Sequence, residues 1–149
     1  MTELTTTLRV LLANEFVAYF KAHSYHWNIE GIDFAQYHDF FGDLYEDFYG
    51  AIDPTAEYLR ILGEYAPVSL METYNYKTIS EDTTKPTTIE QMLTNIGGAN
   101  QELISNLNKL FDVASSANEQ GVADWAAGRL DAHKKHAWMI RSCLKKSGE

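Results

Sequence analysis

Histidines and carboxylates gather in one part of the sequence, between residues 23 and 57. Three of the five histidines fall there, together with a large share of the acidic residues. Imidazole nitrogen and carboxylate oxygen form a ligand set that suits borderline metals such as iron and zinc. The stretch therefore predicts metal binding, and its candidate ligands are His26, His38, Asp53 and Glu57.

Helix geometry limits which of these ligands can share an ion. Asp53 and Glu57 are four residues apart, so on a helix they lie on one face and can hold the same ion. His38 precedes Asp53 by fifteen residues on the same predicted helix, which is about 22 Å along the axis, whereas a metal–ligand bond is about 2 Å. Either these residues form no site, or a second, antiparallel copy of the chain completes it across a two-fold interface.

A motif in this stretch resembles the Dps family, the dodecameric miniferritins of bacteria and archaea. The pattern H-W-N-x-x-G-x-x-F-x-x-x-H spans residues 26–38, and D-x-x-x-E follows at residues 53–57. The segments LLANEFVAYFKAHSYHW, PVSLMETY and KKHAWMIRSCL extend the similarity over most of the chain. The resemblance implies a site between two-fold-related subunits, with His26 and His38 from one subunit and Asp53 and Glu57 from the other.

The resemblance also implies a function, that of a ferroxidase and iron-storage protein. Fe²⁺ would bind at the intersubunit sites, and hydrogen peroxide or oxygen, with peroxide preferred, would oxidise it. The ferric product would be mineralised inside a hollow homododecamer, which protects against oxidative damage. One position departs from the family pattern, because Gly42 stands where the family usually has an aspartate. The second iron position therefore lacks a ligand, and we expect a one-iron or asymmetric site with weakened activity.

Two other functions compete with this reading. One is a structural or DNA-protecting shell protein with a degenerate metal site, and the other is a carrier of a different metal such as Zn²⁺. DNA binding through the tails is not expected, because the start MTELTTTLR has no lysine and only Lys145 and Lys146 precede the terminal Glu149. No Glu-x-x-His motif occurs in the sequence, which argues against a di-iron centre within one chain.

Composition indicates one globular domain over residues 1–149, since 45% of the residues are hydrophobic. The net charge of −9 argues against nucleic acid as the main partner and suits an assembly that attracts cations. Cys143 is the single cysteine, so an internal disulfide is impossible and a reducing compartment is expected. No segment has the length of a membrane span. We expect a cytoplasmic protein without membrane contact.

The apolar spacing predicts an all-α protein, a ferritin-like four-helix bundle. Long helices are expected over residues 4–29, 34–62, 88–116 and 119–145. A crossover over residues 65–86 carries a short extra helix near residues 69–74, and its length lets the chain return along the bundle. Thr87 and Glu90 form a candidate capping box for the third long helix.

Several remaining residues have more than one reading. His23 shares the His26 face loosely, but we expect it to pack or to form a hydrogen bond. His133 and His136, three residues apart, are either a weak metal pair or part of a solvated helix face, and we expect the solvated face. Trp138 is expected to face the core. The acidic residues that open the last helix either offset its dipole or, as the resemblance implies, line a three-fold pore that draws Fe²⁺ inward; they are Glu119, Asp124 and Asp131.

Overall fold

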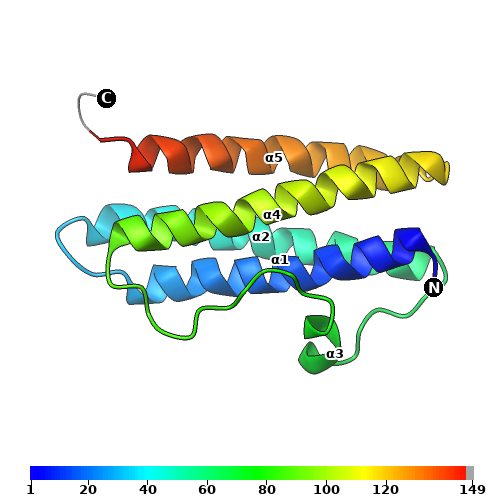
Figure 1. Ribbon diagram of the computed structural model, residues 1–149, viewed down its shortest axis with the longest axis horizontal. Coiled ribbons are helices and arrows are strands. Elements are labelled where there is room, and N and C mark those ends of the chain that lie inside the picture. Colours follow the sequence, from blue (N-terminus) through cyan, green and yellow to red (C-terminus); the bar gives the residue numbers. More distant parts are fainter. Residues whose placement is uncertain (147–149) are drawn as a thin grey trace.

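Four long helices form the protein, and a fifth, short helix lies in the crossover (Figure 1). The computed structural model describes residues 1–146, which contain no strand. Each predicted helix boundary lies within one residue of the observed one, so the predicted fold class is confirmed. The helices are α1 (Glu3–Asn28), α2 (Phe34–Ile61), α3 (Leu70–Tyr74), α4 (Ile89–Ser116) and α5 (Gln120–Leu144).

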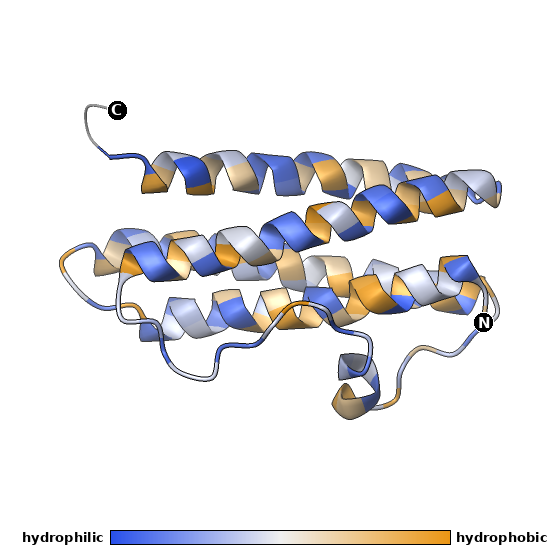
Figure 2. Cartoon of the chain, viewed as in Figure 1, coloured by the Kyte–Doolittle hydropathy of each residue, from blue (hydrophilic) through white to orange (hydrophobic). Residues whose placement is uncertain are grey.

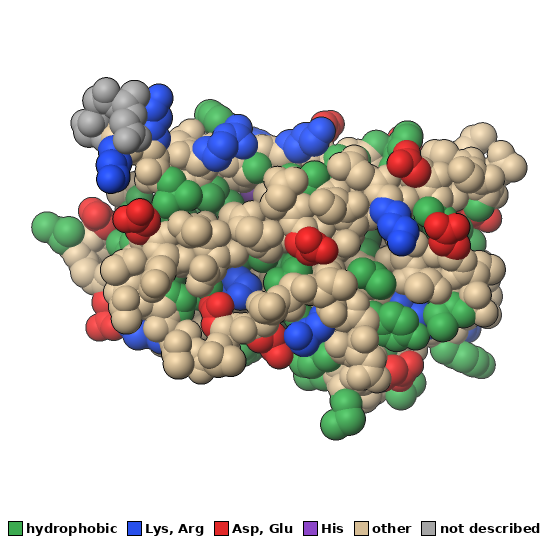
Figure 3. All heavy atoms as spheres, in the orientation of Figure 1, with side chains coloured by type: hydrophobic (Ala, Val, Ile, Leu, Met, Phe, Trp, Pro, Cys, Tyr) green, Lys and Arg blue, Asp and Glu red, His purple; other side chains and the backbone are tan. Residues whose placement is uncertain are grey.

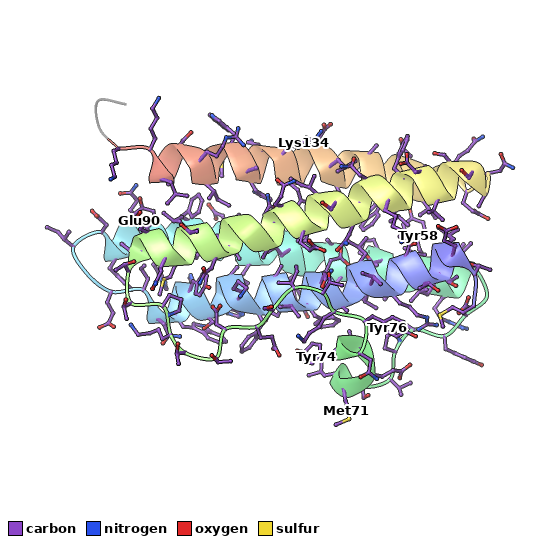
Figure 4. The ribbon with its side chains drawn as sticks, in the orientation of Figure 1. Tyr58, Met71, Tyr74, Tyr76, Glu90 and Lys134 are labelled. Carbon is purple, nitrogen blue, oxygen red and sulfur yellow. The ribbon has the colours of Figure 1, made fainter. Side chains whose placement is uncertain are left out.

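The crossover sets the direction of the second half of the bundle. It returns along the full length of the bundle, so that α4 runs in the same direction as α2 (Figure 1). Helix α1 packs against α2 and α4, and α4 packs against α5. Tyr58 of α2 donates a hydrogen bond to the Gly121 carbonyl at the start of α5, at 3.3 Å, and its place is visible in Figure 4. No helix within residues 1–146 is long and apolar enough to cross a bilayer.

Apolar side chains from all four long helices fill the core, and each helix carries both hydrophobic and hydrophilic residues along its length (Figure 2). Gly97 of α4 lets α5 approach closely, because a Cβ there would lie 3.3 Å from Ile140 Cγ2. The prediction for Trp138 is wrong, since this side chain is 55% exposed. The buried stripe of α5 runs at seven-residue spacing through Ala126, His133 and Ile140, which leaves Trp138 on another face.

Three side chains of α1 hold the crossover against the bundle. The Asn14 Oδ1 atom accepts hydrogen bonds from two crossover amides, at 2.8 and 3.1 Å. Lys21 Nζ donates to Asp82 Oδ1 at 2.9 Å, and the Tyr25 hydroxyl donates to the other oxygen of Asp82. These three residues are seven and four positions apart and therefore share one face of α1. The short α3 helix lies in the part of the crossover that these three side chains do not hold, and its Met71 points away from the bundle (Figure 4).

The capping prediction for α4 is displaced by one residue. The cap is Thr88, whose side chain accepts from the Gln91 amide at 3.1 Å. The Gln91 side chain in turn accepts from the Thr87 amide at 3.1 Å. Gln91 stands at the position predicted for Glu90, one residue later, but its side chain accepts from Thr87 rather than from the amide of the cap, so only the Thr88 half of a capping box forms.

A polar network joins α2, α4 and α5 inside the bundle. The guanidinium of Arg129 donates to both carboxylate oxygens of Asp47, at 3.0 and 2.9 Å, and to His133 Nε2 at 2.9 Å. His133 Nδ1 donates to Asn100 Oδ1 at 2.8 Å, and His136 Nε2 contacts Asp47 at 2.7 Å. The predicted solvated face is therefore wrong for His133, which is buried, because its hydrogen-bonding partners lie far away in the sequence.

The protonation states within this network follow from burial and pairing. Burial, with the neighbouring positive charges of Arg129 and His136, lowers the pKa of His133 to about 3. Burial of the Asp47 carboxyl is opposed by hydrogen bonds from His136 and Arg129, which hold its pKa well below the usual range. An ionised Asp47 and a neutral His133 therefore flank the Arg129 guanidinium.

Glu15 of α1 is the buried carboxyl of this region. Its side chain is fully buried, and its Oε1 atom has no hydrogen-bond partner among the described residues. Burial raises the pKa of Glu15 to about 8, and the Thr55 side chain and the Arg129 charge offset only part of this effect. Glu15 is therefore mostly protonated near pH 7 in the folded protein.

This pKa predicts a loss of stability in mild alkali. The pKa of Glu15 is 4.5 in the unfolded chain and about 8 in the folded protein. Its contribution to folding stability is therefore fully present below pH 4.5 and is lost as pH rises through 8. His133 acts in the opposite direction, but only below its unfolded pKa of 6.5. Between about pH 7 and 9 the thermal midpoint of the wild type should fall at fixed protein concentration, and that of Glu15→Gln should stay level. If the thermal midpoints of the wild type and of Glu15→Gln fell equally over this pH range, the raised pKa of Glu15 would be contradicted.

Candidate metal centre

The turn between α1 and α2 brings two candidate ligands together. His26 lies in the last turn of α1, and His38 lies just beyond the first turn of α2. The link between the two helices is short, and Gly31 within it has a φ of 113°, a left-handed conformation that favours glycine. The two imidazole rings stack with centroids 3.7 Å apart and 17° between their planes.

Reciprocal hydrogen bonds fix both imidazoles. His26 Nδ1 contacts the backbone carbonyl of His38 at 2.6 Å, and His38 Nδ1 contacts the carbonyl of His26 at 2.7 Å. A carbonyl oxygen only accepts, so each Nδ1 carries the hydrogen. In the neutral ring, Nε2 then holds a free lone pair, which is the state that a metal requires. Metal-binding histidines are commonly oriented by such an outer hydrogen bond.

Aromatic rings enclose this pair. Phe34 stacks on His38 with centroids 4.9 Å apart, and the Tyr45 ring lies 5.2 Å from that of His26. His23 stacks on Tyr45 at 3.8 Å, and its Nδ1 is 2.9 Å from the Tyr19 hydroxyl. The prediction that His23 packs and forms a hydrogen bond is therefore confirmed. Burial and the nearby His26 lower the pKa of His23.

Gly42 lies directly against this pair. A Cβ at position 42 would stand 3.2 Å from both Cε1 and Nδ1 of His26. The missing side chain gives the His26 ring its place beside α2, so any residue larger than glycine requires the ring to shift by a few tenths of an ångström.

The acidic pair stands apart from the histidines. Asp53 and Glu57 are exposed, one turn apart on α2, and neither forms a hydrogen bond or an ion pair with other residues in 1–146. Helix α2 is continuous from Phe34 to Ile61 and passes through Pro54. The axial separation of about 22 Å from His38 therefore applies, at about 1.5 Å per residue.

One chain alone does not bring the four predicted ligands together. Within residues 1–146, no three histidine, cysteine, aspartate or glutamate side chains come close enough to hold a metal ion. The structure thus presents two separate halves: an oriented pair of imidazoles at one end of α2 and an unpaired pair of carboxylates toward the other end. The completed site stays a prediction that requires a second copy.

Aromatic side chains are exposed on the α1 and α2 surfaces near these halves. Trp27, next to His26, is 54% exposed, and its ring lies against that of His23 with centroids 4.0 Å apart and 37° between the planes. Phe20 and Tyr49 are also exposed. A surface that carries large aromatic rings beside oriented ligands is typical of a protein–protein contact.

Comparison with known proteins agrees with the fold. A profile of the ferritin-like domain matches residues 6–147, so the chain is a ferritin-like protein. Within that class it belongs to the Dps family. A Brevibacillus brevis protein named "DNA protection during starvation protein" is 30% identical over 134 residues, which are 90% of this chain and 89% of that protein.

Two crystal structures support the same assignment. Dps from Staphylococcus aureus superimposes with a TM-score of 0.91 at 26% identity, over 97% of each chain. A Dps protein from Vibrio cholerae O1, described as one of the ferritin-like diiron-carboxylate proteins, has a TM-score of 0.90 at 25% identity, over 96% of this chain and 89% of that one.

Sequence reasoning missed the polar network around Arg129. Its one local signal was the spacing of His133 and His136, which was read as a solvated face. The partners come from other helices: Asp47 is 82 residues from Arg129 in the sequence, and Asn100 is 33 residues from His133. No local pattern predicts contacts at such separations.

Proposed function

We propose that the protein is an iron-oxidising and iron-storing member of the Dps family, with ferroxidase sites between two-fold-related subunits of a homododecamer. The observation that carries the proposal is the reciprocal hydrogen bonding of His26 and His38, which leaves two Nε2 lone pairs free for a metal. Asp53 and Glu57 supply the missing anionic half from a second copy, since within one chain they lie too far away.

The chemistry assigns a role to each residue. Asp53 and Glu57 neutralise the charge of the substrate Fe²⁺, and the partner's His26 adds a nitrogen ligand. His38 faces the second position, where Gly42 provides no carboxylate, so the interface binds one iron tightly and a second weakly or through water. Hydrogen peroxide accepts the electrons, and the Fe³⁺ product collects inside the shell. The lone Cys143 fits a reducing, cytoplasmic setting.

Anaerobic titration with Fe²⁺ tests this proposal. The protein should elute in gel filtration near twelve times its chain mass of 16.9 kDa and bind a single tight Fe²⁺ per chain, which peroxide then oxidises. Gly42→Asp should add a second position, although the His26 ring must shift to accommodate the new side chain. A monomer without tight Fe²⁺ binding would overturn the proposal, and two equally tight irons per site would overturn the role of Gly42.

DNA protection is the second candidate, because it is the role in the name of the Brevibacillus brevis relative. The net charge of −9 opposes direct contact with phosphates. In Figure 3 basic side chains gather along the edge over α5, where Lys134 points outward (Figure 4), while acidic side chains are spread over the rest of that face. Contact with DNA would therefore need bridging cations. Glu149, which the sequence analysis used in its argument about the tails, lies outside the described residues.

A further inference from the structure

A tyrosine and a histidine form a hydrogen-bonded pair beside the proposed iron site. The Tyr19 hydroxyl lies 2.9 Å from His23 Nδ1, and both residues are on the same face of α1, four positions apart. In the tautomer with its hydrogen on Nε2, His23 accepts the phenol hydrogen at Nδ1. A phenol that loses an electron becomes a strong acid, so a base at this distance allows the proton to leave together with the electron.

Aromatic rings connect this pair to the iron ligands. The His23 ring is 3.8 Å from Tyr45, nearly parallel at 5°, and 6.0 Å from His26. The Tyr19 ring lies 6.2 Å from that of Tyr45. Tyr19 and His23 are both partly buried. An electron can therefore pass from the Tyr19 phenol toward His26 through rings in contact, without a long gap.

The reduction of hydrogen peroxide at a one-iron site needs one electron more than the iron supplies. Reduction of hydrogen peroxide to two hydroxide ions takes two electrons, and a single Fe²⁺ supplies one. Since Gly42 deprives the second iron position of its carboxylate, the tight site holds one iron. One iron alone would cleave the O–O bond into a hydroxide ion and a hydroxyl radical, so the second electron must come from elsewhere.

We propose that Tyr19 supplies this second electron and that His23 receives the Tyr19 proton, an inference that rests on the proposed function. The step balances: hydrogen peroxide, Fe²⁺, the Tyr19 phenol and neutral His23 give two hydroxide ions, Fe³⁺, the Tyr19 phenoxyl radical and protonated His23. The O–O bond breaks, and Fe²⁺ and the phenol each lose one electron. The next Fe²⁺ to arrive reduces the phenoxyl radical, which takes its proton back from His23.

A single-turnover experiment tests the pair. The assembled protein is loaded without oxygen with one Fe²⁺ per chain, binding is measured, and one equivalent of hydrogen peroxide is added before rapid freezing. The wild type should show a tyrosyl radical by electron paramagnetic resonance. Tyr19→Phe should bind Fe²⁺ as the wild type does, yet lose most of that signal and release more hydroxyl radical to a spin trap. His23→Phe keeps a ring between Tyr45 and Trp27 but lacks the base, and it should behave like Tyr19→Phe.

Tyr65→Phe is the matched control, since Tyr65 is an exposed phenol that contacts Arg60 rather than an imidazole, and it should match the wild type. A full tyrosyl signal in Tyr19→Phe would overturn the inference while leaving the proposed function intact. A tryptophan radical instead of a tyrosyl radical in the wild type would do the same. Failure of the proposed function appears one step earlier, as the absence of Fe²⁺ binding in the wild type, and the inference then falls with it.

Discussion

Replacing Arg129 by methionine is expected to lower the stability of the protein by about 3 kcal/mol. The guanidinium is the cation that pairs with Asp47 through two hydrogen bonds, and it also donates to the neutral His133. Its side chain is only 14% exposed, so water cannot replace these contacts fully. Methionine preserves much of the buried volume but leaves the Asp47 carboxylate with His136 alone, and loss of one partner of a buried pair costs more than loss of both.

Chemical denaturation at fixed protein concentration measures this effect. Arg141→Met is the matched control, because Arg141 lies on the same helix and is exposed, and it should change stability by less than about 0.5 kcal/mol. Adding Asp47→Asn to Arg129→Met should restore part of the loss, since the unpaired charge is then removed. If Arg129→Met were no more harmful than Arg141→Met, the network would not hold α2 against α5.

Replacing Glu57 by alanine is expected to abolish tight Fe²⁺ binding. Even outer-shell changes at metal sites reduce affinity about 10- to 100-fold, and loss of a direct carboxylate should exceed that. Glu46→Ala is the matched control: Glu46 is exposed on the same helix, eleven residues earlier and on the same face, and its removal should leave binding unchanged. His38→Ala should spare most of the tight binding, because that position uses Asp53, Glu57 and the partner's His26.

Anaerobic calorimetry with Fe²⁺ distinguishes these variants. An equal loss of Fe²⁺ affinity in Glu46→Ala and Glu57→Ala would indicate a general effect of negative charge rather than a direct ligand. Damage from His38→Ala as large as that from Glu57→Ala would place His38 at the tight position and contradict the role assigned to Gly42.

Much of the fold could be predicted because its signals are local. Apolar spacing located all four long helices, and the predicted ends lie within one residue of the observed ones. The errors arose where a local pattern competes with distant contacts. Trp138 was expected to face the core, but the buried stripe of α5 follows Ala126, His133 and Ile140. His133 is buried because Asn100 and Arg129 satisfy both of its ring nitrogens.

The candidate site could be predicted only in part. Spacing alone showed that His38 and Asp53 cannot share an ion within one chain, and the continuous α2 helix has that geometry. The orientation of His26 and His38 depends on two carbonyl contacts across the helix pair, which the sequence does not encode in any motif. Likewise, Gly42 could be recognised as a missing carboxylate, but the contact of His26 with the empty Cβ position becomes visible only in three dimensions.

Mixed assemblies test the intersubunit site most directly. One variant lacks the imidazoles (His26→Ala with His38→Ala) and the other lacks the carboxylates (Asp53→Ala with Glu57→Ala), so each alone should bind no tight Fe²⁺. When equal amounts of the two unfolded chains are assembled together, half of the two-fold pairs are mixed and each mixed pair regains one of its two sites, so about a quarter of the sites should bind Fe²⁺. Binding that is no greater than in the two variants assembled separately would contradict a site shared between subunits.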